Sequence, residues 1–185
     1  PPGARHAVTM TAELARVFET KRRGVRFIVD AVCQAFPDGH LWFYTTDGRF
    51  VTADEASAFP YAVAAANWSA TARVVAMQYP DAILIDVGTT TTDIVPIRGG
   101  RVVARGLTDL DRLIADELLY TGAVRTPVEA ITTVVPVPGG TCSLAAEAFA
   151  LSGDVHLWRG HLRPQDYTSP TPDGRPPTRK SAGIR

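Results

Sequence analysis

The spacing of apolar residues in the first part of the chain predicts two strands that alternate with two helices. The predicted elements are strands at residues 6–10 and 41–45, a short returning strand at 50–51, and helices at 22–36 and 61–79. Pro37 ends the first helix and Pro80 ends the second, because proline cannot donate a helical hydrogen bond. Two strands joined by a helix in this order indicate a parallel sheet, so we expect an α/β protein.

From residue 81 the predicted strands follow one another more closely. The predicted elements are strands at residues 83–87, 92–97, 101–105 and 131–137, and helices at 109–119 and 143–150. Very short turns join the first three strands, which are therefore expected to be antiparallel. Thr108 is the expected N-cap of the helix that follows, with Asp111 at its third position and Gly122 as its stop.

The distribution of proline divides the chain further. Prolines recur among polar residues after Arg163, which predicts an extended, flexible segment. We therefore expect three parts: residues 1–80, residues 81–162, and the proline-rich residues 163–185. The chain opens on Pro1 and Pro2 without an initiator methionine and closes at Arg185 straight after the proline-rich stretch, so we favour an interior fragment of a longer protein, with a processed protein as the alternative.

The charge balance excludes the usual signature of a nucleic-acid or acidic-membrane binder, since 19 basic and 19 acidic residues cancel. No apolar run reaches the roughly 18 residues of a membrane helix, and the N-terminus lacks a signal-peptide layout. The two cysteines, Cys33 and Cys142, form neither a metal-type spacing nor a disulfide framework. We expect a cytoplasmic protein that binds neither nucleic acid nor membrane, and we leave its oligomeric state open.

The loop between the predicted strands 83–87 and 92–97 gathers the most chemically useful side chains. It consists of Asp86, Val87, Gly88, Thr89, Thr90, Thr91, Thr92 and Asp93. Gly88 allows a ligand to approach the backbone, and successive N–H groups and threonine hydroxyls can bind an anion. Asp86 and Asp93 could hold Mg²⁺ or another divalent metal through water. The alternative is a plain hairpin with a threonine-rich turn, because threonine is a good strand residue.

A second group of candidates follows the first predicted strand. Thr9, Thr11 and Glu13 come where a parallel strand ends, which is the edge at which α/β proteins bind ligands. Glu13 could be a general base or help hold the metal, and the alternative is a solvated residue at a helix start. Asn67 could face the same cleft, although we favour helix packing for Asn67 and Trp68.

The pattern Asp-x-Gly-x-x-Thr-x-Asp, from Asp86 to Asp93, resembles the second phosphate loop of the actin, sugar-kinase and Hsp70 ATPase superfamily. The order of elements is also similar, since residues 1–80 resemble the second half of one lobe and residues 81–119 the start of the next. The resemblance implies a two-lobed, actin-like (ribonuclease H-like) fold, present here as an incomplete fragment. It also implies a cleft for a small-molecule diphosphate or a nucleotide such as ATP.

Five stretches in order indicate a closer family, and they are residues 6–14, 24–28, 66–68, 85–94 and 119–127. Together they resemble the hydantoinase/oxoprolinase-related proteins linked to tetrahydromethanopterin C1 transfer, which include the synthases of methanofuran biosynthesis. The resemblance implies a transferase that joins an aminomethylfuran-methanol diphosphate to γ-glutamyltyramine and releases pyrophosphate. Glu13 would then act on the tyramine phenol. The family's first phosphate loop and its adenosine-type glycine motif are expected outside this chain, which alone would be inactive.

Two other functions stay open for the same loop. An ATP-dependent hydantoinase or oxoprolinase would use it to phosphorylate an amide oxygen. A non-catalytic nucleotide-binding module would only bind there, because this fold also serves filaments and chaperones and does not fix function.

Overall fold

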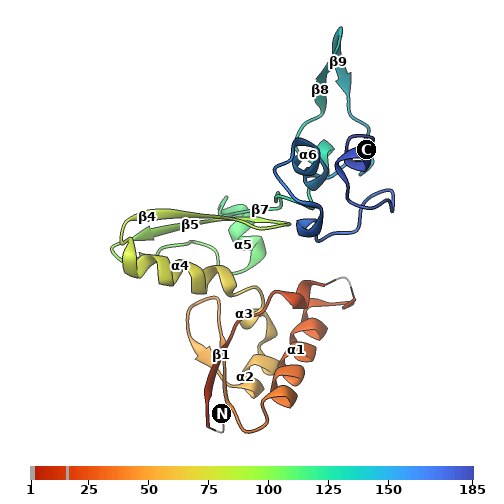
Figure 1. The fold of residues 1–185 in the computed structure, drawn as a ribbon. Coiled ribbons are helices and arrows are strands. Elements are labelled where there is room, and N and C mark those ends of the chain that lie inside the picture. Colours follow the sequence, from red (N-terminus) through yellow and green to blue (C-terminus); the bar gives the residue numbers. More distant parts are fainter. Residues whose placement is uncertain (1–2, 16) are drawn as a thin grey trace. The chain divides into compact units, whose positions relative to one another are not determined.

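The structure, a computed structural model, describes residues 3–15 and 17–185 and shows a mixed α/β protein with several small sheets (Figure 1). Pro1 and Pro2, on which the expectation of a fragment rests, lie outside the described residues. Contacts divide the chain into two compact units. Unit 1 comprises the chain up to Leu84 together with Ile94–Glu117, and unit 2 comprises Ile85–Asp93 and Leu118–Arg185.

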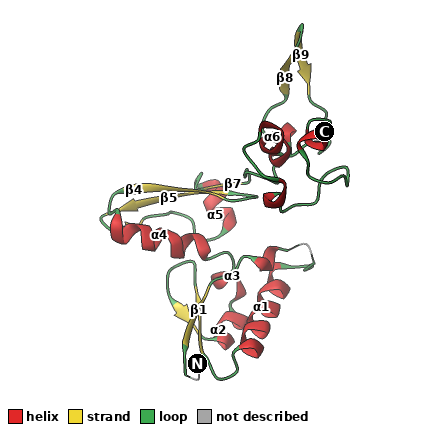
Figure 2. Ribbon diagram, viewed as in Figure 1, coloured by secondary structure: helices red, strands yellow, loops and turns green. Residues whose placement is uncertain are grey.

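Unit 1 begins with a three-stranded sheet and the helices beside it (Figure 2). Its elements are β1 (Arg5–Val8), η1 (Ala12–Leu14), α1 (Lys21–Ala35), β2 (His40–Tyr44), β3 (Phe50–Val51), α2 (Ala53–Ala58) and α3 (Pro60–Val63). β1 and β2 are parallel, with Arg5 paired to His40, and α1 forms the crossover between them. β3 returns antiparallel to β2. The predicted parallel pair and the short returning strand are confirmed.

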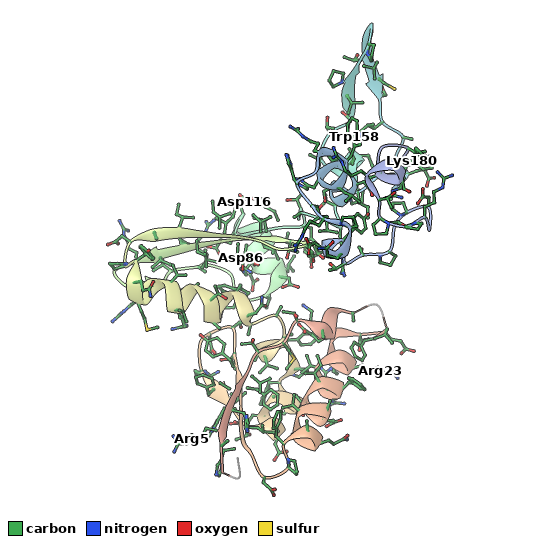
Figure 3. The ribbon with its side chains drawn as sticks, viewed as in Figure 1. Arg5, Arg23, Asp86, Asp116, Trp158 and Lys180 are labelled. Atoms are coloured by element: carbon green, nitrogen blue, oxygen red, sulfur yellow. The ribbon has the colours of Figure 1, made fainter. Side chains whose placement is uncertain are left out.

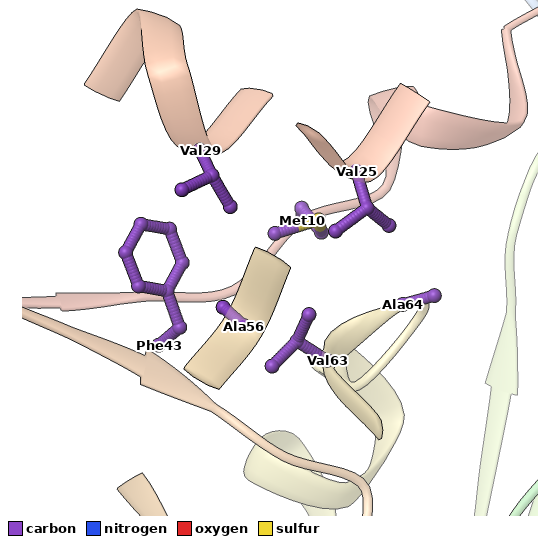
Figure 4. Close-up of a cluster of buried hydrophobic side chains, with 7 residues drawn as sticks. All are labelled: Met10, Val25, Val29, Phe43, Ala56, Val63 and Ala64. Carbon is purple, nitrogen blue, oxygen red and sulfur yellow. The ribbon is translucent and has the colours of Figure 1, made fainter. Parts of the chain in front are cut away.

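The core of this region lies between the sheet and the helices α1, α2 and α3. Its buried members are Met10, Val25, Val29, Phe43, Ala56, Val63 and Ala64 (Figure 4). Burial of each of the larger side chains, those of Met10, Phe43 and the three valines, contributes roughly 1.5–3 kcal/mol. α1 supplies Val25 and Val29 because its apolar residues recur at helical spacing, and Thr20 caps its start by accepting a hydrogen bond from the Arg23 N–H.

The single helix predicted over residues 61–79 is wrong. The chain forms α3 and then α4 (Asn67–Gln78), with Ala65 between them in a left-handed conformation at φ 49°. The Ala65 N–H donates to Glu13 Oε1 at 2.7 Å, so the break is held by a carboxylate 52 residues away. α4 buries Trp68 and Ala72 against Val95, which confirms the packing role favoured for Trp68.

A second sheet follows α4. Its strands are β4 (Ala82–Val87), β5 (Thr92–Arg98), β6 (Arg101–Val102) and β7 (Leu118–Leu119). β5 pairs with β4, β6 and β7, and its pairings with β6 and β7 are antiparallel. The turn at Gly99 and Gly100 has positive φ at both residues, which glycine adopts without strain.

The helix predicted over residues 109–119 is shorter than expected. α5 spans Asp109–Ile114 and begins with the predicted capping box between Thr108 and Asp111. Its leucines and Ile114 are largely exposed, and the buried residue of α5 is instead Arg112, whose guanidinium lies 3.9 Å from the Trp68 ring centroid. The predicted stop at Gly122 is wrong, because the helix ends at Ile114 with Ala115 as its C-cap, and Asp116 takes the left-handed conformation.

The remainder of unit 2 contains short elements. They are η2 (Val128–Ala130), β8 (Val134–Val137), β9 (Gly140–Ser143), α6 (Ser152–Arg159), η3 (Pro164–Asp166) and α7 (Arg179–Ala182). β8 confirms part of the predicted strand, but the helix predicted over residues 143–150 is wrong, because Ser143 ends β9 and α6 starts only at Ser152. Leu157 packs with Tyr167 and Ala182, so the proline-rich segment contributes to a core.

No helix within the described residues is both long and apolar enough to cross a membrane.

Candidate functional site

The threonine-rich loop is a tight turn between β4 and β5. The Gly88 N–H donates to the Thr91 carbonyl at 2.8 Å, which closes a turn with Thr89 and Thr90 at its tip. A Cβ on Gly88 would lie 3.2 Å from the Thr91 oxygen, so glycine suits this position. The loop therefore has the geometry of the plain hairpin that was the alternative to an anion site. Its capacity to bind a ligand depends on what its polar groups contact.

A segment from another part of unit 2 binds the carbonyl groups of this turn. Ala123 N–H donates to the Gly88 carbonyl at 2.9 Å, and the Thr89 carbonyl accepts from both Val124 N–H (3.1 Å) and Arg125 N–H (2.9 Å). Thr92 Oγ1 donates to the Thr121 carbonyl at 2.7 Å. Residues 121–125 therefore fix the loop through its acceptors.

The N–H donors of the same turn remain available. Within residues 3–15 and 17–185, the N–H groups of Thr89, Thr90 and Thr91 donate to no other residue, and their hydroxyl groups make no hydrogen bond. Three successive N–H groups with neighbouring hydroxyls match the donors that backbone anion sites use. Because the carbonyls of Gly88, Thr89 and Thr91 accept hydrogen bonds while these three N–H groups donate to no described residue, the loop can bind an anion such as phosphate.

Gly122 lies directly against this turn. A Cβ built on Gly122 would lie 2.6 Å from the Thr89 carbonyl carbon and 2.6 Å from the Thr90 nitrogen, far inside van der Waals contact. Any side chain here would therefore push the tip of the loop away from its bracing segment.

Thr126 and Ser152 lock the bracing segment to the start of α6. Thr126 Oγ1 accepts from Gly122 N–H at 2.7 Å and donates to the Gly122 carbonyl at 3.1 Å. Ser152 Oγ also donates to the Gly122 carbonyl (2.8 Å) and accepts from Thr126 N–H (3.3 Å). Both residues are buried, and unsatisfied partners would each cost about 1–3 kcal/mol. The loop is thus held by residues 121–125, and these are held in turn by Thr126 and by Ser152 at the start of α6.

The two aspartates lie on one face of the hairpin. Extending the Gly88–Thr91 register by two residues pairs Asp86 with Asp93, and by four residues pairs Leu84 with Val95, which belong to one hydrophobic cluster. Residues directly opposite each other have Cβ atoms about 4.5–5.5 Å apart, close enough to share one hydrated cation. Figure 3 labels Asp86, which is half-buried, on β4.

No cluster of three or more histidine, cysteine, aspartate or glutamate side chains that could hold a metal occurs among the described residues. A metal at Asp86 and Asp93 would therefore take its remaining oxygens from water, hydroxyls or a substrate. Mg²⁺ ordinarily binds in this way, through one or two carboxylates and several waters. The residues present fit a hydrated Mg²⁺ and do not fit a site made only of protein side chains.

Unit 1 holds the other predicted residues. Glu13 is 1% exposed, which contradicts the alternative of a solvated helix start. Its Oε1 accepts from Ala65 N–H, while Oε2 has no hydrogen-bond partner within the described chain. Thr9 and Thr11 are exposed, and Asn67 is half-buried at the start of α4, two residues from Ala65. Glu13 thus contacts the backbone two residues before Asn67.

Sequence reasoning missed the residues that hold the loop. Gly122 was interpreted as a helix stop, and Thr126 and Ser152 were not singled out. Arg125 has an exposed side chain, and its N–H donates to the Thr89 carbonyl. A signal existed, because residues 119–127 were among the five stretches that carried the family resemblance.

Comparison with known proteins identifies the family. Residues 5–185 match the family described as Hydantoinase/oxoprolinase. A relative from Methanocaldococcus jannaschii is 42% identical over 169 residues, which are 91% of this chain and 51% of the relative. A relative from Methanococcus vannielii is 40% identical over 103 residues, 56% of this chain and 46% of the relative. Both are named (4-{4-[2-(gamma-L-glutamylamino)ethyl]phenoxymethyl}furan-2-yl)methanamine synthase.

The chain spans about half the length of the curated relatives that it matches. The expected resemblance is confirmed: this chain belongs to the hydantoinase/oxoprolinase family and is related within it to the synthases of methanofuran biosynthesis.

Proposed function

We propose that the full-length protein is a transferase of C1-carrier biosynthesis that forms an aryl ether and releases pyrophosphate, with the Asp86–Asp93 loop as its diphosphate site. The observation that carries the proposal is that three consecutive N–H groups, those of Thr89, Thr90 and Thr91, donate a hydrogen bond to no described residue. The proposed reactants are an aminomethylfuran-methanol diphosphate and γ-glutamyltyramine or a related phenol.

The names of the relatives support this chemistry. Their product contains a phenoxymethyl group attached to a furan, that is, an ether between a phenol oxygen and a furan CH₂. One route to that bond is attack by the phenol oxygen on the CH₂ carbon while the C–O bond to a diphosphate breaks. The diphosphate leaves with the bonding electron pair as pyrophosphate, and the phenol proton passes to a base. This reaction needs donors where charge develops on the departing diphosphate.

The loop supplies such donors in fixed positions. In the proposed complex the N–H and hydroxyl groups of Thr89, Thr90 and Thr91 bind the diphosphate oxygens, and Arg125 extends its exposed guanidinium toward the same anion. Asp86 and Asp93 would hold Mg²⁺, which when bound neutralises part of the diphosphate charge. The bracing by Gly122, Thr126 and Ser152 keeps the donors in place before the substrate arrives.

Glu13 is the proposed proton acceptor for the phenol, and Oε2 is the oxygen left for that proton. The same side chain also fixes the Ala65 turn through Oε1, so it would position the end of β1 as well. The two-lobed, actin-like fold is part of the proposal. In that fold the Asp86–Asp93 loop is one of two phosphate clamps.

The family name favours a second candidate, an ATP-dependent hydantoinase or oxoprolinase hydrolase. It would bind the ATP phosphates at the same donors and transfer the γ-phosphoryl group to an amide oxygen. A nucleotide-binding module without catalysis would use the loop for binding only.

Product assays on the full-length protein with Mg²⁺ distinguish these candidates. Pyrophosphate release from the furan-methanol diphosphate that depends on γ-glutamyltyramine supports the transferase. Phosphate release from ATP that a cyclic amide stimulates contradicts it and supports the hydrolase. Binding of either phosphate compound with no turnover indicates the binding module.

A further inference from the structure

The hairpin of β8 and β9 has no core of its own. Figure 1 shows the two strands standing out from α6 with no other element of unit 2 beside them. Every residue of both strands is exposed except the half-buried Val135, and Val134 and Val137 are 45% and 42% exposed. A two-stranded hairpin alone is only marginally stable in water, so this one gains from any strand that pairs with it.

The register decides which backbone groups face outward. Val135 pairs with Cys142 and Pro136 with Thr141, and beyond the strands the Leu144 N–H donates to the Thr133 carbonyl. Hydrogen-bonded and non-hydrogen-bonded pairs alternate in an antiparallel ladder. The Val135–Cys142 pair is therefore hydrogen-bonded within the hairpin. The non-hydrogen-bonded residues, Val134 and Pro136 on β8 and Thr141 and Ser143 on β9, direct their backbone groups away from the partner strand.

The two outer edges differ in what they offer. Pro136 lies at an outward-facing position of β8 and has no N–H, which interrupts the donors on that edge. On β9 the outward positions are Thr141 and Ser143, each with an N–H and a carbonyl. β9 is thus open to a further strand, while β8 is blocked.

We propose that β9 pairs antiparallel with β9 of a second copy of this protein, which gives a four-stranded sheet across a two-fold axis. Thr141 of each copy would exchange two hydrogen bonds with Ser143 of the other. Residues 130–146 contain no charged residue and no histidine, so two identical hairpins meet without like-charge repulsion. Because Pro136 blocks the outer strand, association stops at two copies instead of continuing as an open stack.

This register brings the two Cys142 residues together at the axis as a non-hydrogen-bonded pair. The Cα atoms of such a pair lie roughly 4.5 Å apart, within the range of roughly 4.4–6.8 Å that a disulfide spans. Cys142 is exposed and free, as the link requires. A disulfide between the two Cys142 residues would report the register, since a shift by one residue would move the two thiols to opposite faces of the sheet.

Sedimentation velocity of the full-length protein and mild oxidation test the proposal together. We expect a dimer for the natural sequence and a reducible covalent dimer after oxidation. Cys142→Ser should abolish the covalent link, and Cys33→Ser, the matched control at the other cysteine, should retain it. Thr141→Pro should give a monomer, because it removes an outward N–H and no bond within the hairpin, and Pro136→Thr should give assemblies larger than a dimer.

A monomeric natural sequence overturns the proposal, and so does a dimer that survives Thr141→Pro and forms no link through Cys142. The oxidation experiment keeps the natural backbone, so it still decides the matter if Thr141→Pro fails to fold. None of these outcomes depends on catalysis.

Discussion

Gly122 lies against the peptide that joins Thr89 and Thr90, so closely that a Cβ at Gly122 would be 2.6 Å from the Thr90 nitrogen. These residues are far apart in sequence, and their contact puts a backbone brace behind the tip of the threonine loop. The brace occupies the carbonyls of Gly88 and Thr89, and the N–H groups of Thr89, Thr90 and Thr91 donate to no described residue. This contact is one reason why we propose an anion site at an otherwise plain two-residue turn.

The Gly122→Ala substitution should therefore displace the loop without unfolding the protein. We expect affinity for pyrophosphate to fall by about tenfold or more, equivalent to roughly 1.4 kcal/mol, with the circular dichroism spectrum unchanged. Isothermal titration of the full-length protein measures this. Gly140→Ala is the matched control, because a Cβ there meets no atom within 4 Å. Equal affinities for the two variants would show that the Gly122 contact does not shape the site.

Glu13 allows its two proposed roles to be separated. Glu13→Ala removes the acceptor of the Ala65 N–H and should lower the free energy of unfolding by about 1–3 kcal/mol. Glu13→Gln keeps an oxygen for that bond, so we expect near-normal stability but strongly reduced turnover if Oε2 accepts the phenol proton. Urea unfolding and product assays measure the two effects, with the exposed Glu147→Ala as the control. Normal turnover in Glu13→Gln would leave only the positioning role.

Tyr167 gives a prediction for alkaline pH. Burial, reinforced by the nearby negative charge of Asp154, raises the pKa of Tyr167 from 10 to about 12. The unfolded chain thus loses the phenol proton near pH 10 while the folded protein keeps it. The stabilisation is complete below pH 10 and is lost as the pH rises to about 12.

Tyr167→Phe should therefore flatten the fall in unfolding free energy between pH 10 and about 12. Urea unfolding across this range measures the effect, and Tyr61→Phe, at a 55% exposed tyrosine, is the control. An identical pH dependence in the natural sequence and in Tyr167→Phe would contradict the assignment.

Local patterns predicted much of the fold. The helical period of α1, the short turns around β5 and the capping box at Thr108 are all determined by neighbours in sequence, and all are present. The failures arise from distant contacts. Nothing near Ala65 indicates a break, because the group that holds it is the Glu13 carboxylate. Likewise the helix expected over residues 143–150 does not form, because Ser143 pairs with Val134 across the β8–β9 hairpin.

At the candidate site, too, local patterns were predictable and distant contacts were not. The Asp86–Asp93 pattern identified the loop, since its residue types and spacing are continuous in sequence. It could not indicate that Gly122 and Ser152 brace the loop, because that requires the fold to bring the start of α6 to residues 121–126. Glu117 was missed for a similar reason: it is buried, and its carboxylate accepts hydrogen bonds from the N–H groups of Arg105 and Gly106.

The most direct test of the central claim is the affinity of the full-length protein for pyrophosphate with Mg²⁺, measured by isothermal titration for the natural sequence and for Asp86→Asn. Asp30→Asn, on the exposed side of α1, is the charge-matched control. The proposal predicts that Asp86→Asn weakens binding by about tenfold or more, that Asp30→Asn does not, and that the difference disappears when the metal is removed. Equal affinity of Asp86→Asn and the natural sequence would contradict the assignment of this loop as the diphosphate site.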